Sequence, residues 1–228
     1  MKEALKLWGP VALVAFIGVF IALRIIAPPP PKVITFAAGG ADGSYYALAG
    51  AYKTALDAHG IKVEVLETAG TGENYRLLLS GEADVALLQG GIAGEAEREA
   101  VITLGGVFPE PFWVFVKRER GVERFGDLRG ARIAAGSEGS GTRALADQMQ
   151  AAWGGRWSAL SPLSGDAAAS ALRSGDVDAA VFAASVKTPY IQALLNDPNI
   201  QVVSIRRANG LAMNYPALSP ITLYEGVI

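Results

Sequence analysis

A short turn motif occurs twice in this sequence, and its repetition limits the folds that the chain can adopt. The pattern Ser-Gly-acid-x-Asp is found at 80–84 and again at 174–178, and each copy leads into an apolar run. A second pair, Gly43-Ser44 and Gly139-Ser140, recurs in the same order at nearly the same spacing. Because two matches in one order are much less expected by chance than one, we interpret the chain as two copies of one plan.

Each copy begins with a β-rich run and alternates strands with helices. In the first copy, a Gly-rich loop leads from the first strand into an Ala- and Leu-rich helix that His59-Gly60 ends. This alternation predicts an α/β fold with parallel sheets and right-handed crossovers. The expected strands are 33–36, 62–66, 85–88, 131–135 and 179–182, and the expected helices are 45–58, 74–79, 142–153 and 166–173.

A proline-rich turn, Pro109-Glu110-Pro111, precedes the aromatic strand 112–116 and marks the connection between the copies. Such a strand suits a crossover that both lobes share. The sequence therefore predicts a two-lobed molecule. We place lobe 1 at 32–111, lobe 2 at 112–203 and the start of a return to lobe 1 at 204–228.

The N-terminal segment has the composition of a membrane anchor. Lys2 and Lys6 precede a run with no charged residue from 7 to 23, close to the roughly 20 apolar residues of a spanning helix. We interpret residues 1–31 as an uncleaved signal anchor, held by 7–27, and a proline-rich spacer; a cleaved signal peptide is the alternative. The globular part is then expected on the periplasmic side of the inner membrane.

Three loops precede helices in a way that suits an anion. A helix start directs unpaired N–H groups and the positive end of its dipole outward, and glycines let a ligand approach that backbone. We expect these loops to meet in one crevice, although a simple N-cap explains any one of them alone. The groups are Gly43-Ser44-Tyr45, Thr71 to Asn74, and Ser140-Gly141-Thr142 with Arg143 as a clamp; Gln89, after a strand, is expected at the same edge.

Several function classes are disfavoured by composition. The formal net charge of -2 argues against nucleic-acid binding, and the absence of cysteine excludes thiol and disulfide chemistry. With His59 as the only histidine, a catalytic triad or a zinc site is not expected. No P-loop or nucleophile-elbow pattern occurs, so we predict a binding protein with no cofactor, no metal and no enzymatic activity.

Four blocks together resemble the TAXI family of receptors that serve TRAP transporters. They are Ala38 to Tyr46, Thr68 to Asn74 with Ser80 to Ala86 and Gln89, Gly136 to Arg143, and Ser174 to Asp178. The resemblance covers about 32–203, and its order is more specific than any single block. It implies a two-lobed, type II periplasmic-binding-protein fold that closes by a hinge motion.

The resemblance also implies a ligand, a partner and a set of cleft residues. The ligand would be a small anionic organic molecule such as glutamate, glutamine or a dicarboxylate, delivered to a TRAP membrane permease. Cleft residues by resemblance are Ser44, Tyr45, Thr71, Asn74, Gln89, Ser140, Gly141, Thr142 and Arg143, with Phe182 and Ala183 against the carbon chain.

Two departures leave alternatives open. The family usually has a cleaved signal, and its members run longer, so we expect the C-terminal part of lobe 1 to be missing here. A membrane-tethered ectodomain that senses a ligand would use the same fold, and fold does not decide between the two functions. An enzyme that relies on carboxylates and lysine alone is the third reading.

Overall fold

The computed structural model describes residues 2–26, 31–92, 94, 99–153, 156–215 and 217–224. The chain divides into two units, 1–33 and 34–228, which are described separately. The sequence segments 27–30, 95–98 and 225–228 lie outside the described residues. Most of the expected proline spacer and the last residues of the expected return to lobe 1 are among them.

The first unit is dominated by one long helix, α1 (Lys2–Ile26). Its segment Trp8–Ile25 is long and apolar enough to cross a membrane, judged by length and composition alone. The side chains of this segment are exposed in the unit, which is what an apolar helix without a protein partner shows. A signal sequence would have the same features.

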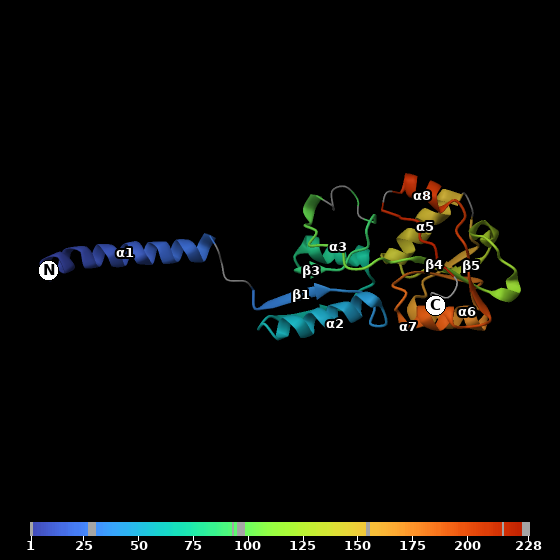
Figure 1. Cartoon of the computed structure of the whole chain (residues 1–228), viewed down its shortest axis with the longest axis horizontal. Helices are drawn as coiled ribbons and strands as arrows, with labels where there is room; N and C mark the ends of the chain where they lie inside the picture. The colour runs from blue at the N-terminus through green and yellow to red at the C-terminus, as the bar shows by residue number, and fades with distance from the viewer. Residues whose placement is uncertain are drawn as a thin grey trace. The chain divides into compact units, whose positions relative to one another are not determined.

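The second unit contains two separate sheets (Figure 1). The smaller one has the strand order β2-β1-β3 and is associated with two helices; we refer to it as lobe 1. The first strand lies in the middle, because the chain reaches β2 on one side of it and then crosses over it to β3 on the other side. Its elements are β1 (Val33–Ala37), α2 (Ser44–Asp57), β2 (Lys62–Leu66), α3 (Thr71–Ser80) and β3 (Val85–Ala86).

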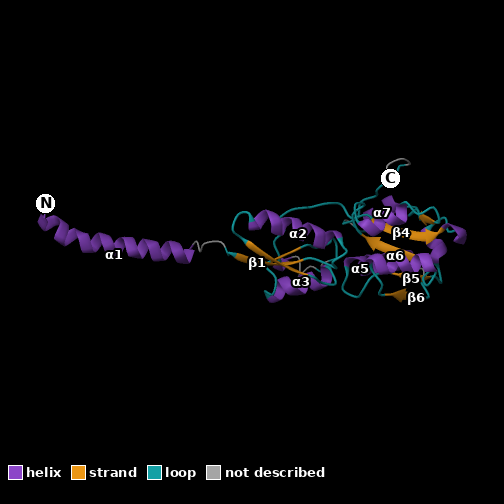
Figure 2. Cartoon of the chain, turned by 90° about the horizontal axis from the view of Figure 1, so that it is seen from below, coloured by secondary structure: helices purple, strands orange, loops and turns teal. Residues whose placement is uncertain are grey.

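The larger sheet has five strands in the order β6-β5-β7-β4-β8, and we refer to it with its helices as lobe 2 (Figure 2). Its strands are β4 (Phe112–Lys117), β5 (Arg132–Ala134), β6 (Ala159–Ser161), β7 (Ala179–Ala183) and β8 (Ile200–Val202). Its helices are η1 (Arg118–Arg120), η2 (Phe125–Leu128), α5 (Gly141–Trp153), α6 (Gly165–Ser174), α7 (Pro189–Leu195) and α8 (Ala208–Asn214).

The side chains of β4 alternate between two hydrophobic layers, one on each face of the larger sheet. Trp113 and Phe115 pack in the layer that contains α6 and α7. Val114 and Val116 point to the other face and pack in the layer that contains α5. Because successive side chains of a strand alternate between faces, an uninterrupted apolar run such as 112–116 is the pattern of a strand covered on both sides.

Strand β4 also corrects the expectation of purely parallel sheets. The pairs β1–β3, β5–β6 and β5–β7 are parallel, but β4 runs antiparallel to both β7 and β8. It belongs wholly to the larger sheet, so it is not a strand shared by both lobes. The physical reason is its connection: the chain reaches β4 from lobe 1 and not through a βαβ crossover of lobe 2, so the handedness rule for crossovers does not set its direction.

The repeated turn motif forms the same structure in both lobes. Gly81 and Gly175 each end a helix in the left-handed region, with φ of 73° and 88°. Ser80 and Ser174 each donate a side-chain hydrogen bond to a carbonyl three residues back, at 3.2 and 3.1 Å. A glycine at this position avoids the steric cost that a Cβ would incur with positive φ, which explains why the motif places glycine there.

The aspartate that ends each motif then ties the turn to a strand of its lobe, β1 in lobe 1 and β5 in lobe 2. The carboxylate of Asp84 accepts the main-chain N–H of Thr35 at 2.7 Å, and that of Asp178 accepts the N–H of Arg132 at 2.8 Å. In return, the N–H groups of Asp84 and Asp178 donate to the carbonyls of Thr35 and Arg132. The match of these bonds supports the interpretation of two copies of one plan.

Replacing Asp178 by asparagine should reduce the free energy of unfolding by about 1–2 kcal/mol, because a charged acceptor for Arg132 and Arg120 is lost at a surface where solvent screens the pair. The hydrogen bond from Arg132 lowers the pKa of Asp178, so this contribution is present at neutral pH and lost as the pH falls through that depressed pKa. Urea denaturation of the full chain in detergent measures the change. Asp176→Asn is the matched control, since its carboxylate accepts the Ser174 hydroxyl; an equal loss in both variants would refute this role for Asp178.

Candidate ligand-binding site between the lobes

The starts of α3 and α5 touch each other across the two lobes. The N–H of Gly72 donates to the carbonyl of Gly139 at 2.8 Å. A Cβ at Gly72 would lie 2.6 Å from that same oxygen, so only glycine lets the two backbones approach so closely. Gly70 precedes α3 with φ of 116°, a conformation that glycine adopts without strain. The loops before α3 and α5 therefore pack closely against each other through their backbones.

Gln89 and Thr71 lie beside the first residue of α5. The Thr71 hydroxyl accepts the N–H of Gln89 at 3.0 Å. A Cβ on Gly141 would overlap the side-chain amide of Gln89 and would lie 3.2 Å from the Thr71 hydroxyl. The expectation that the Thr71, Gln89 and Ser140-Gly141 segments converge agrees with this geometry.

A second contact joins the Gly-rich loop before α2 to the start of α6. The carboxylate of Asp42 in lobe 1 accepts the N–H of Asp166 in lobe 2 at 3.1 Å. The N–H belongs to the first turn of α6, where the helix dipole favours a negative charge. The two lobes thus also meet where the loop before α2 in lobe 1 contacts the start of α6 in lobe 2.

Tyr45 contacts a carboxyl group that the sequence analysis did not select. Its hydroxyl donates a 2.5 Å hydrogen bond to Glu110, which lies just before β4. Burial raises the pKa of Glu110 to about 7, with the Tyr45 hydrogen bond opposing the shift. Burial and the negative charge of Glu110 raise the pKa of Tyr45, so the phenol stays protonated as the donor. The nearby Thr71 hydroxyl, at the start of α3, acts in the opposite direction and lowers the pKa of Tyr45.

Tyr190 from α7 adds a second phenol near the same carboxyl groups. Burial is the largest cause of the raised pKa of Tyr190, and the charges of Asp42, Glu110 and Asp166 raise this pKa further. Three carboxyl groups from different parts of the chain therefore act on one phenol. The region has hydrogen-bond donors and acceptors from both lobes and a negative potential around Glu110.

The first turn of α5 offers unpaired donors to this region. Ser140 caps the helix: its hydroxyl accepts the N–H of Arg143 at 3.1 Å, and its carbonyl accepts the N–H of Ala144. Among the described residues, no acceptor binds the N–H groups of Gly141 and Thr142. The Thr142 hydroxyl accepts the N–H of Ala183 at 3.0 Å, which fixes the helix start to the end of β7.

Other residues expected in the cleft have structural partners. Asn74 has no exposed surface, and its amide bonds Thr68 and the carbonyls of Ala38 and Leu87, so it holds lobe 1 together. Phe182 is buried, and its ring lies 6.0 Å from that of Phe115 and 5.3 Å from that of Tyr190. Gly43 and Ser44 lie at the start of α2, partly exposed.

Arg143 is engaged within its own helix. Its guanidinium group pairs with Asp147 one turn further along, with a shortest N–O distance of 3.2 Å. The pair spans positions i and i+4, a common arrangement on helix surfaces. To clamp an anion, as expected from the sequence, Arg143 would have to share or exchange this partner.

Sequence reasoning missed Glu110, Asp42 and Tyr190 as members of this region. A signal for Glu110 was present, because a proline on each side restricts its backbone and it lies in the segment that connects the lobes. Asp42 lies in the quoted Gly-rich loop but was assigned no role. Tyr190 carried no signal, because its helix was not predicted.

Solved structures share this fold. An ancestral arginine-binding protein bound to arginine matches with a TM-score of 0.58 at 18% identity, covering 81% of this chain and 88% of that one. A protein of Bordetella bronchiseptica RB50 matches at 0.59 and 23%, covering 81% and 60%. The alkanesulfonate-binding protein SsuA from Xanthomonas axonopodis pv. citri, bound to MOPS, matches at 0.57 and 18%, covering 82% and 69%. These likenesses confirm the expected α/β fold of periplasmic binding proteins.

No curated protein matches the sequence. The model of one family matches residues 36–227, which include all of the larger sheet, most of the smaller one and the whole candidate site. The chain therefore belongs to the NMT1-like family.

Proposed function

We propose that this protein is an extracytoplasmic receptor that captures a small carboxylate-bearing solute between lobes 32–111 and 112–203. The observation that carries the proposal is the contact between Gly72 and Gly139, because it brings helix starts of both lobes to one place. In open α/β sheets, ligands bind beyond the carboxyl ends of the strands, where such helices begin. Residues 204–228 would return toward lobe 1.

The carboxylate of the solute would bind at the first turn of α5. The N–H groups of Gly141 and Thr142 supply two donors there, and the dipole of a helix that runs to Trp153 favours a negative charge. Thr71 and Gln89 lie within reach of the same position, on the side of lobe 1. Arg143 would strengthen the site if ligand binding drew it away from Asp147.

Glu110 favours an α-amino acid over a dicarboxylate. A second carboxylate of the ligand would be repelled by Glu110, Asp42 and Asp166. An ammonium group of the ligand would instead form a charge-assisted hydrogen bond with Glu110, which offsets the energetic cost of ionising this buried acid. Tyr45 already orients the Glu110 carboxyl group toward this region. We infer that the ligand carries both charges, as glutamate and glutamine do.

The partner in this proposal is a membrane permease of the TRAP type, which the sequence blocks shared with TAXI receptors support. The apolar segment Trp8–Ile25 would keep the receptor at the periplasmic side of the inner membrane. The same tethered site would serve a sensor equally well. Release of the captured solute to a co-purified permease in vesicles distinguishes a transport receptor from a sensor.

A panel of solutes should shift the melting temperature of the full chain selectively. We expect L-glutamate, L-glutamine or another α-amino acid to stabilise the protein by about 2.7 kcal/mol at 100-fold its dissociation constant. Succinate and 2-oxoglutarate should stabilise it less, because both lack the ammonium group. Thermal unfolding in detergent measures the effect. Flat curves for every amino acid would refute the proposed function, and larger shifts with dicarboxylates would refute the amino-acid assignment alone.

A further inference from the structure

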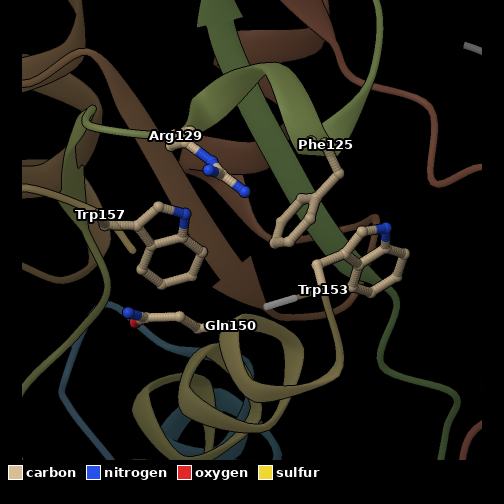
Figure 3. Close-up of a pocket in the computed structure, with 6 residues that line it drawn as sticks. Phe125, Arg129, Gln150, Trp153 and Trp157 are labelled. Atoms are coloured by element: carbon tan, nitrogen blue, oxygen red, sulfur yellow. The ribbon is translucent and has the colours of Figure 1, made fainter. Parts of the chain in front are cut away.

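A separate cavity of about 120 Å³ lies in lobe 2 near the end of α5 that is opposite to Gly141 (Figure 3). Gln150 and Trp153 reach it from the last turn of that helix, so it is not part of the site between the lobes. The cavity is lined by Phe125, Gly126, Arg129, Gln150, Trp153 and Trp157.

Three aromatic rings form its walls. Phe125 is 3% exposed, and its ring lies 4.9 Å from that of Trp153 and 5.9 Å from that of Trp157. The Phe125 and Trp157 rings are nearly perpendicular, at 74°. Figure 3 shows the guanidinium group of Arg129 extending between Trp157 and Phe125, with Gln150 on the helix side. The walls are thus apolar, whereas Arg129 and Gln150 bring polar groups to the same space.

A wider hollow of about 410 Å³ adjoins this cavity through their shared residues Phe125, Gly126 and Trp153 and carries more arginines. Arg124 pairs with Asp127 at 2.9 Å. Arg129, Arg206 and Arg207 have no carboxylate partner among the described residues. A chain with a formal net charge of -2 therefore concentrates unpaired positive charge around one aromatic cavity.

Arg207 is also held in an uncommon backbone conformation. Its φ is 62°, the one positive value among the described residues other than glycine. Such strain persists where the surroundings require it, and it is enriched at ligand sites. Here it places Arg207 directly before α8, at the hollow.

We propose that the cavity and the hollow form a second ligand site, for an organic anion that carries one aromatic ring. An apolar cavity of about 150 Å³ accommodates benzene in a protein interior, so the inner cavity of about 120 Å³, which adjoins the hollow, has room for no more than a single ring. Aromatic walls favour tilted and edge-to-face ring contacts. The planar guanidinium groups suit a carboxylate or sulfonate at the mouth, where two parallel hydrogen bonds form.

Titration of the full chain with benzenesulfonate, followed by tryptophan fluorescence and calorimetry, tests this site. The chain has four tryptophans, two of which line the cavity, so binding should change the emission. We expect saturable binding at one site. Arg129→Gln and Arg207→Gln should each weaken it about tenfold, because each removes a charged donor. Arg118→Gln removes one positive charge elsewhere on lobe 2 and should leave the affinity unchanged.

Two probes separate this site from the cleft between the lobes. Methanesulfonate has the charge without the ring, and benzyl alcohol has the ring without the charge; both should bind far more weakly than benzenesulfonate. Equal binding of methanesulfonate, or unchanged affinity in both Arg129→Gln and Arg207→Gln, would overturn the proposal by placing the anion elsewhere. No saturable binding of benzenesulfonate at millimolar concentration would overturn it as well.

Discussion

Replacing Glu110 by glutamine should weaken the binding of an α-amino acid by about 2–5 kcal/mol, or roughly 30- to 4,000-fold. The variant keeps the size of the side chain and an acceptor for Tyr45, but it removes the charge that would hold the ligand ammonium group. Calorimetry with L-glutamate at pH 8, where Glu110 is ionised, measures the change.

The matched control is Glu123→Gln, which removes the same charge from an exposed position in lobe 2. It should bind L-glutamate as the unmodified chain does. If Glu110→Gln also retained full affinity, the ammonium group would not contact Glu110, and the preference for amino acids would lose its basis.

Glu110 also determines how stability depends on pH. Its folded pKa of about 7 lies above the model-peptide value, so the folded ligand-free protein binds more protons than the unfolded chain between these values. Its stability should therefore fall as the pH rises from about 4.5 to about 7, by at most about 3 kcal/mol. Glu110→Gln should remove this decline, and amino-acid affinity of the unmodified chain should rise over the same interval.

Gly72→Ala should weaken ligand binding by about 1–3 kcal/mol, or roughly 5- to 150-fold, while leaving lobe 1 folded. The added Cβ would lie 2.6 Å from the carbonyl of Gly139, and main chain on both sides leaves little room to adjust. Alanine is a better helix former than glycine, so α3 itself should not suffer. Small-angle scattering with ligand should show a more open molecule than the unmodified chain.

Gly50→Ala provides the contrasting substitution. A Cβ at Gly50 meets nothing within 4 Å, and the residue lies inside α2, so alanine should stabilise the protein by about 0.5–1 kcal/mol without affecting ligand affinity. Unchanged ligand affinity in Gly72→Ala would contradict the proposal that the Gly72–Gly139 contact helps to form the ligand site.

The repeated turn allowed much of the fold to be predicted because local chemistry determines it. A glycine with positive φ and an aspartate that accepts from a neighbouring strand (β1 or β5) recur in both lobes, so Gly81 and Gly175 identify equivalent helix ends. The direction of β4 was not predictable in this way, because an apolar run such as 112–116 reads the same in either direction. The short elements β6, α7 and β8 were missed, since three to seven residues carry too little periodicity.

The candidate site was predictable where backbone chemistry forms it and not where distant side chains meet. The glycines in the loops before α3 and α5 indicated that another group could approach the backbone closely there. The Tyr45–Glu110 pair joins residues 65 positions apart, so no local pattern reveals it. Asn74 illustrates the opposite error: an amide near a helix start looks like a ligand donor, but burial directs its bonds inward.

Hydrogen exchange with mass spectrometry on the full chain tests the central claim most directly. The sample would contain the α-amino acid that produces the largest thermal shift. Peptides covering the first turns of α3 and α5 should become strongly protected together, because closure and ligand contacts both cover Gly72, Gly141 and Thr142. Protection confined to one lobe, or none at either helix start under saturating ligand, would contradict capture between the lobes.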